Sequence, residues 1–223
     1  MLSHVVERCQ AILPRFPVYV ITPPCDRDLY PEALAPDCDE NDVLARHVLA
    51  AQTLGADAIM RVTSDCPFLD PQAAKNVLSA FMARSPGIDY CANDLVQTYP
   101  DGLGVEIVTY EALHYAHLAV HPSPSLDNKD RVHVTPYVRR HLRGLPCSHR
   151  GNPQGKALFE GVNLRCPTPS VEWIKLSVDT PTDITLARSL YAVGGLLPGS
   201  YALVNTLVAY RKVQEHGQTE GAD

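Results

Sequence analysis

The sequence predicts an α/β fold with a mostly parallel sheet and helices on both of its faces. Short apolar runs alternate with segments of helical apolar periodicity through the first half of the chain, and this order is typical of right-handed βαβ units. The chain has 223 residues, of which 45% are hydrophobic and 20% charged, as in an ordinary globular domain with a substantial core. We expect one domain over residues 1–213 and a flexible tail over residues 214–223.

Each expected element has a local signal. The first helix stops at Pro14, the second is capped by Asn41 or Asp42 and stops at Gly55, and Asp70 before a proline marks the start of the third. The expected helices cover residues 2–13, 42–54, 71–85, 111–120, 134–142, 181–193 and 201–213. The expected strands cover residues 18–21, 58–63, 89–92, 104–109 and 173–178.

The charge balance and the cysteine pattern exclude several classes of function. Lys and Arg number 19 against 25 Asp and Glu, a net charge of -6, which is opposite to the balance of a general nucleic-acid binder. No apolar run reaches the ~18–20 residues of a membrane span, and the N-terminus does not resemble a signal peptide. The seven cysteines are odd in number and form no C-x-x-C, so we expect free thiols in a cytoplasmic protein with no membrane or nucleic-acid partner.

Two carboxylates follow expected strands. Asp65 comes just after the strand that ends at Thr63, and Asp179 ends the strand over 173–178. Ligands of such sheets bind beyond the carboxyl ends of the strands, where two carboxylates suit a hard cation such as Mg²⁺. The alternative is that both are helix caps, since Pro67 and Pro181 follow closely.

Five motifs in order resemble the cytidylyltransferases that activate sugar acids. The resemblance is strongest to the spore coat polysaccharide biosynthesis branch, which is related to acylneuraminate and 3-deoxy-manno-octulosonate cytidylyltransferases, and it runs from residue 1 to about residue 192. The motifs are NDVLAR at 41–46, RVTSDCP at 61–67, YPDGLGVE at 99–106, HVTPY at 133–137 and SVDTPTD at 177–183.

The resemblance implies a Rossmann-like nucleotide-diphospho-sugar transferase fold that moves CMP from CTP to a sugar or sugar acid, as a homodimer, in polysaccharide or glycoconjugate synthesis. It implies that Asp65 and Asp179 hold Mg²⁺ and that Arg61 assists catalysis. Residues implied to lie near the nucleotide are Asn41, Asp42, Arg46 and Ser64. Residues implied to face the acceptor are Asp101, Gly102, Glu106, His133 and Thr135.

Several of these residues have structural alternatives. Asn41 and Asp42 can be caps only, and residues 101–102 can be a turn only. His133 can be a surface histidine, and Arg61 can pair with a buried carboxylate in place of a phosphate.

The sequence departs from the family pattern in two places. Family members begin with a strand and a Gly-, Arg- and Lys-containing loop around the triphosphate, whereas this sequence starts at the helix that follows; Gly151–Gly155 and Gly194–Gly195 follow no suitable strand. We therefore expect weak CTP binding and little turnover from these 223 residues. Gly104 stands where the branch commonly has an acidic residue. The alternatives to an active enzyme are a catalytically inactive binding or assembly subunit and a nucleotide-sugar-dependent glycosyltransferase.

Three other groups of residues could indicate a different chemistry. His114, His117 and His121 share one face of an expected helix, but ordinary packing is the favoured interpretation. Cys66 is interpreted as a small apolar residue and not as a nucleophile. The basic cluster over 138–143 is either a solvated face or close to phosphate.

Overall fold

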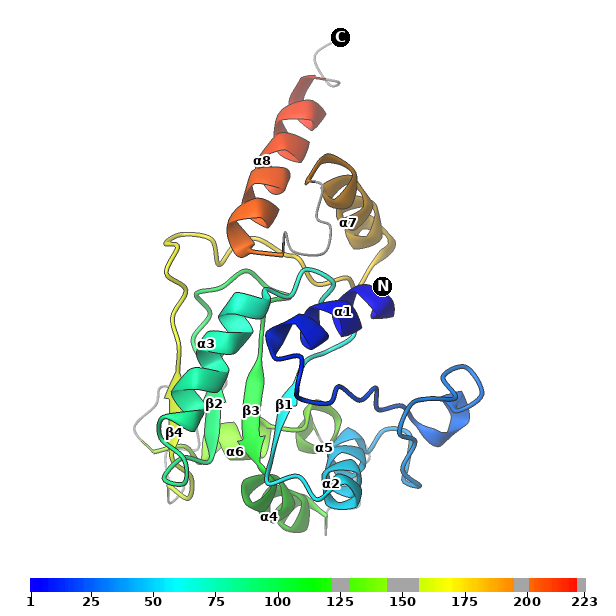
Figure 1. Ribbon diagram of the computed structural model, residues 1–223, viewed down its shortest axis with the longest axis vertical. Coiled ribbons are helices and arrows are strands. Elements are labelled where there is room, and N and C mark those ends of the chain that lie inside the picture. Colours follow the sequence, from blue (N-terminus) through cyan, green and yellow to red (C-terminus); the bar gives the residue numbers. More distant parts are fainter. Residues whose placement is uncertain (122–128, 144–156, 195–200, 220–223) are drawn as a thin grey trace.

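The computed structural model describes residues 1–121, 129–143, 157–194 and 201–219 (Figure 1). The candidate glycine segment 151–155 and Gly195 lie outside these ranges. The helices are α1 (Leu2–Ile12), α2 (Val43–Leu54), α3 (Pro71–Met82), α4 (Tyr110–Val120), α5 (Lys129–His133), α6 (Pro136–Arg140), α7 (Pro181–Gly194) and α8 (Leu203–Thr219), with a 3-10 turn over Pro24–Asp26. The strands are β1 (Ala58–Arg61), β2 (Tyr90–Ala92), β3 (Glu106–Thr109) and β4 (Gly161–Asn163).

The helix boundary signals in the sequence are confirmed. The Asp42 side chain accepts a hydrogen bond from the Ala45 amide and caps α2, while Gly55 ends that helix with φ +61°. Asp70 caps α3 in the same way. These signals succeed because capping joins groups only a few residues apart.

The sheet has the order β1-β3-β2-β4. β3 is antiparallel to both β1 and β2, and only β2 and β4 are parallel, so a mostly parallel sheet is not confirmed. The reason is the connection over 93–105, which returns the chain to the same end of the sheet before β3 begins. The segments 18–21 and 173–178 were expected as strands but form only isolated bridges, Ile21 with Leu34 and Lys175 with Asp101.

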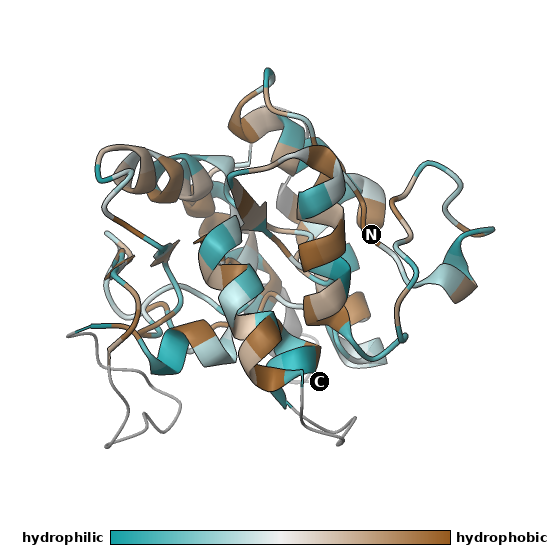
Figure 2. Ribbon diagram, turned by 90° about the horizontal axis from the view of Figure 1, so that it is seen from below, coloured by the Kyte–Doolittle hydropathy of each residue, from teal (hydrophilic) through white to brown (hydrophobic). Residues whose placement is uncertain are grey.

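Helices cover both faces of the sheet, as expected. The pleat of β2 shows this directly, because Tyr90 and Ala92 pack against α2, α4 and α6, whereas Cys91 packs against α1 and α3. In Figure 1, α3 lies on one side of the strands and α4 and α6 lie on the other. Most helices carry both apolar and polar residues in Figure 2, as expected for helices with one buried face.

The C-terminal helices α7 and α8 pack against each other and form a third core cluster with Phe68, Leu103 and Leu176. Figure 1 places the pair at one end of the molecule, beyond the sheet. The helix α8 continues to Thr219, past residue 214, where the flexible tail was expected to begin. Tyr210 and Val213 pack on this cluster and anchor the helix. Among the described residues, no helix is long and apolar enough to cross a membrane.

We predict that Asp70→Ala lowers the free energy of unfolding by about 2–3 kcal/mol. The Asp70 carboxylate accepts hydrogen bonds from the Gln72 amide at 2.7 Å and, through its other oxygen, from the Leu203 amide at 2.9 Å. Its loss removes the cap of α3 and leaves a buried amide at the start of α8 unpaired. Urea unfolding measures the change. Asp70→Asn keeps an acceptor and should lose less; equal losses would contradict this explanation.

Candidate functional site

The candidate site lies at one end of the sheet. β1 ends at Arg61, which is in register with Glu106 at the start of β3, and β2 ends at Ala92, also in register with Glu106. Asn93 follows β2 and bonds the next loop at two points, donating to the Leu103 carbonyl at 2.9 Å and accepting from the Val105 amide at 2.8 Å. Residues that follow β1 and β2 are thereby held beside the loop that precedes β3.

The two aspartates predicted to work together lie on neighbouring segments. The Val178 amide donates to the Asp65 carbonyl at 2.9 Å, which holds the turn after β1 against the segment that carries Asp179. Asp65 is half-buried and Asp179 is exposed, so both can reach solvent. Among the described residues, neither side chain accepts a hydrogen bond from a helix amide, and the cap of α7 comes from Thr180 and Asp183.

A third carboxylate joins them. The Ser177 hydroxyl lies 2.7 Å from Asp101 Oδ2 and 3.3 Å from Asp179 Oδ2, so both carboxylates are within hydrogen-bond reach of one oxygen. The backbone of Asp101 bonds on both sides of Lys175, to the Ile174 carbonyl and the Leu176 amide. Gly102 has φ +90°, and a Cβ there would lie 2.4 Å from the Ser177 nitrogen. Asp101 was predicted to face the acceptor, and the structure places it beside the predicted metal aspartates.

Lys175 binds two carboxylates of the same segment. Its ammonium lies 2.8 Å from Asp179 Oδ2 and 2.6 Å from Asp183 Oδ2. Asp183 also accepts from the Thr180 amide at 2.9 Å and its own amide donates to the Thr180 hydroxyl at 3.3 Å, a capping box at the start of α7. These contacts hold the pKa of Asp183 well below its usual range and raise that of Lys175.

Glu106 lies at the centre of a buried polar cluster. Arg61 Nη1 donates to it at 2.7 Å, the Tyr90 hydroxyl at 2.5 Å and the Thr135 hydroxyl at 2.5 Å. Arg139 Nε lies 3.3 Å from it, and the Arg139 guanidinium also pairs with Asp94. We call these six residues the Glu106 cluster. Glu106 is only 4% exposed, and both of its carboxylate oxygens contact other side chains of the protein. Its contact with an acceptor stays a prediction.

The charges in the Glu106 cluster shift the pKa values of its two carboxyl groups in opposite directions. Burial favours a raised pKa for Glu106, but the Arg139 and Arg61 guanidiniums outweigh it and hold the pKa below its usual value. Burial and the nearby Glu106 charge raise the pKa of Asp94 despite the opposing effect of Arg139. A Cβ on Gly104 would lie 3.3 Å from Asp94 Oδ2, so a carboxylate from the end of β2 occupies the space beside the glycine that departs from the family pattern.

The helix expected over 134–142 is shorter in the structure, where α6 covers Pro136–Arg140 and Val134 lies in the turn between α5 and α6. This buried residue has φ +75° and sits in a tight turn in which the Thr135 amide donates to the His133 carbonyl at 2.9 Å. A β-branched residue in this region is strained, and such strain is concentrated at functional sites. The turn buries Thr135 against Glu106 and leaves His133 exposed. The acceptor contacts of both residues stay predictions.

An ion pair between Arg131 and Asp42 lies at the start of α2. Asp42 is buried, caps the helix through one oxygen and accepts from Arg131 Nε at 2.9 Å through the other. Both oxygens therefore have structural contacts, and its nucleotide contact stays a prediction. Arg46 is 5% exposed; it donates to the Glu40 carbonyl at 3.0 Å, and its Nη1 has no hydrogen-bond partner in the structure. Asn41 and Ser64 are exposed.

The basic cluster over 138–143 pairs with carboxylates. Arg140 pairs with Asp130 at 2.5 Å and Arg143 with Glu160 at 2.7 Å, while Arg139 belongs to the Glu106 cluster. The sequence left two interpretations of this segment open, a solvated face and a phosphate contact. Neither of them included these ion pairs. Asp94 could have been found by the rule that selected Asp65, because it follows a strand. Lys175 and Arg139 do not follow a strand, so this rule could not have selected them.

Cys66 and the three histidines at 114, 117 and 121 were the other candidates for chemistry in the sequence. Burial raises the pKa of Cys66 to about 12, so its thiol is protonated at neutral pH, in agreement with an apolar role. The described cysteines are free thiols. No group of three or more His, Cys, Asp or Glu side chains is arranged to hold a metal ion in the described ranges, the face of His114, His117 and His121 included.

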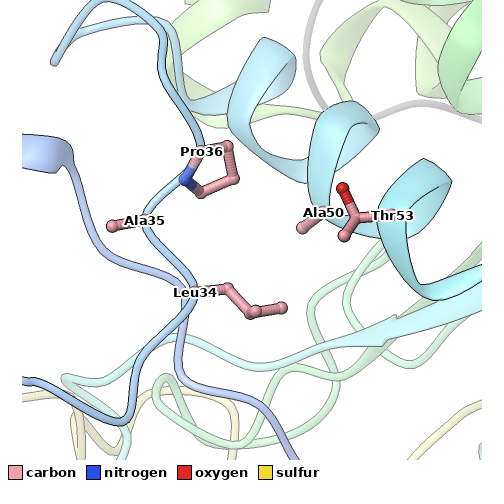
Figure 3. Close-up of a pocket in the computed structure, with 5 residues that line it drawn as sticks. All are labelled: Leu34, Ala35, Pro36, Ala50 and Thr53. Carbon is pink, nitrogen blue, oxygen red and sulfur yellow. The ribbon is translucent and has the colours of Figure 1, made fainter.

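A small hollow of about 200 Å³ lies between the loop over 34–36 and α2. Figure 3 shows Leu34 and Pro36 on the loop facing Ala50 and Thr53 on the helix. None of its lining residues belongs to the predicted site, and none is charged.

The chain is similar to one curated protein in sequence and to one solved structure in fold. It is 26% identical over 159 residues to the spore coat polysaccharide biosynthesis protein SpsF of Bacillus subtilis (strain 168), covering 71% of this chain but 57% of that protein. A solved structure of a cytidylyltransferase from Leptospira borgpetersenii serovar Hardjo-bovis (strain JB197) matches with a TM-score of 0.71 at 20% identity, over 96% of this chain and 84% of the other. No family model matches. The resemblance stated from the five motifs is confirmed, and the fold is that of a cytidylyltransferase.

Proposed function

We propose that the chain belongs to an enzyme that transfers CMP from CTP to a sugar or sugar acid, for the synthesis of a cell-surface polysaccharide or glycoconjugate. The observation that carries the proposal is that the segments of Asp65 and Asp179, 114 positions apart in the sequence, lie side by side, because the Val178 amide donates to the Asp65 carbonyl at 2.9 Å. The similarity to SpsF and the cytidylyltransferase fold support this chemistry.

The reaction needs charge neutralisation more than covalent catalysis. An acceptor oxygen attacks the α-phosphorus of CTP, the bond between the α-phosphorus and the bridging oxygen breaks, and pyrophosphate leaves while the acceptor proton goes to solvent. The rate depends on positioning the reactants and on stabilising the negative charge of the phosphates. Asp65, Asp179 and the exposed Lys175 supply charged groups at one edge of the site.

The donor set of the site suits Mg²⁺ that is shared with a nucleotide. Two carboxylates are available, and Mg²⁺ usually takes one or two carboxylates together with phosphate oxygens and waters. When bound, Mg²⁺ would neutralise phosphate charge. Asp65 and Asp179 would hold it, and the Ser177 hydroxyl, which lies 2.7 Å from Asp101 and 3.3 Å from Asp179, can donate its proton to either of these two carboxylates.

The Glu106 cluster shapes the adjoining part of the site. Arg61 and Arg139 are held by Glu106 and Asp94 in a neutral arrangement of two cations and two anions. Their side chains are 18% and 17% exposed, so part of each reaches solvent. We propose that these exposed parts meet the acceptor, together with His133.

Asp65→Ala and Asp179→Ala are each expected to weaken Mg²⁺-dependent CTP binding by about tenfold or more. Each change removes one of the two anionic ligands of the cation. Isothermal titration of the chain with CTP, with and without Mg²⁺, measures the change, and Asp28→Ala in the exposed loop after residue 26 is the matched control. Unchanged affinity in both variants would contradict the metal assignment.

The same titration and a pyrophosphate-release assay separate the alternatives. CTP binding with pyrophosphate release on addition of a sugar acid supports the enzyme. CTP binding without release from any sugar acid favours a binding or assembly subunit, and transfer from a preformed nucleotide sugar favours a glycosyltransferase.

A further inference from the structure

Lys175 is the cation that the sequence did not single out and that lies against a predicted metal ligand. Its ammonium is 2.8 Å from Asp179 Oδ2, the same oxygen that lies 3.3 Å from the Ser177 hydroxyl. A divalent cation on that oxygen would therefore meet a positive charge at short range. Like charges at such separations repel, so the ammonium and the divalent cation compete for Asp179.

The ammonium has a second partner that stays in place when the first is taken away. Asp183 Oδ2 lies 2.6 Å from Lys175 Nζ, and Asp183 is fixed by the Asp179 and Thr180 amides at the start of α7. The Asp183 side chain is 17% exposed, whereas that of Asp179 is 54% exposed. Lys175 can thus release Asp179 without losing its ionic partner.

The released ammonium would remain at the edge where nucleotide phosphates gather. Its side chain is 43% exposed, and the Lys175 backbone pairs with Asp101, whose carboxylate lies beside Ser177. An ammonium on a flexible stem is a common partner of phosphate oxygens.

We infer that Lys175 occupies Asp179 in place of the divalent cation and turns to the phosphates of the nucleotide when the cation binds. The inference rests on the proposed function and adds a residue to it. Its consequence is that the cation binds weakly alone and more tightly with the nucleotide, because the nucleotide gives the displaced ammonium a new partner. Binding of the two ligands is therefore coupled through this residue.

Manganese binding to the intact chain without nucleotide tests the inference. Lys175→Met should bind Mn²⁺ about fivefold more tightly than the unmodified chain, the size expected for removing one exposed cation from a carboxylate. Lys175→Arg keeps the charge and should stay close to the unmodified chain. Lys75→Met, on α3, removes the same charge elsewhere and should have no effect. Electron paramagnetic resonance of free Mn²⁺ gives the affinities, and thermal unfolding checks that each variant is folded.

Opposite results distinguish the possible failures. If Lys175→Met folds normally and binds Mn²⁺ equally or less tightly, Lys175 only orients Asp179 and the inference is wrong. If Asp179→Asn binds Mn²⁺ as the unmodified chain does, the metal assignment of the proposed function is itself wrong. In the presence of CTP, the gain in Mn²⁺ affinity should be smaller for Lys175→Met than for the unmodified chain; an equal gain would also overturn the inference.

Discussion

Replacing Gly102 with alanine should lower the free energy of unfolding by about 3 kcal/mol. A Cβ at this position would lie 2.4 Å from the nitrogen of Ser177 and 2.6 Å from the carbonyl carbon of Leu176. Both are backbone atoms, which cannot move aside as a side chain could. The φ of +90° adds the strain of a left-handed conformation. The loop would have to leave the segment over 174–177, so the contact between Asp101 and Ser177 should be lost as well.

Gly55→Ala is the matched control for this prediction. Gly55 also has positive φ, +61°, but a Cβ there would meet no atom within 4 Å. Its replacement should therefore cost only the backbone strain, about 1 kcal/mol. Chemical unfolding of both variants measures the difference, which isolates the contact between the two segments. Equal losses would show that the close approach at Gly102 is not needed.

Replacing Glu106 with glutamine should lower the free energy of unfolding by about 3–5 kcal/mol. The change keeps the shape of the side chain but removes the buried charge that the Arg61 and Arg139 guanidiniums share. Asp94 would then be the remaining carboxylate of the Glu106 cluster for both guanidiniums. The Arg61 and Arg139 side chains should lose their fixed positions, so the acceptor should bind more weakly in addition.

Glu160→Gln is the control for the loss of an ion pair at the surface. Glu160 lies 2.7 Å from Arg143, with side chains 50% and 69% exposed. An exposed pair of this kind contributes at most about 1 kcal/mol. Similar losses for the two variants would mean that burial of Glu106 is not decisive.

The same carboxyl sets a pH dependence with a definite sign. The pKa of Glu106 lies below its usual value of 4.5 in the folded chain, so its contribution is present above about pH 4.5 and is lost as the pH falls through the folded pKa. Asp94 has the opposite sign, because its raised pKa disfavours folding as the pH rises through that value. Glu106→Gln should therefore lose less stability than the unmodified chain on acidification below pH 4.5. A steeper loss would contradict the assignment.

Several residues that the sequence motifs selected lie together in the structure. These are Arg61, Glu106 and Thr135. Their side chains bind one another, and the alternative that Arg61 pairs with a buried carboxylate is the one the structure supports. The mostly parallel sheet is not confirmed, because alternating elements predict crossovers but do not reveal the direction in which β3 runs.

The features that the sequence alone determined depend on interactions between residues close together in the chain. The caps at Asp42 and Asp70, the end of α2 at Gly55 and the apolar face of each helix depend on groups within a few residues of one another, and such groups are read directly from the order of the amino acids. Only the tertiary structure brought Arg139 to Glu106, Asp101 to Ser177 and Lys175 to Asp101, contacts that follow from register and from close backbone approach. A one-residue shift in register would separate every one of those pairs, and the amino-acid order carries no direct record of that register.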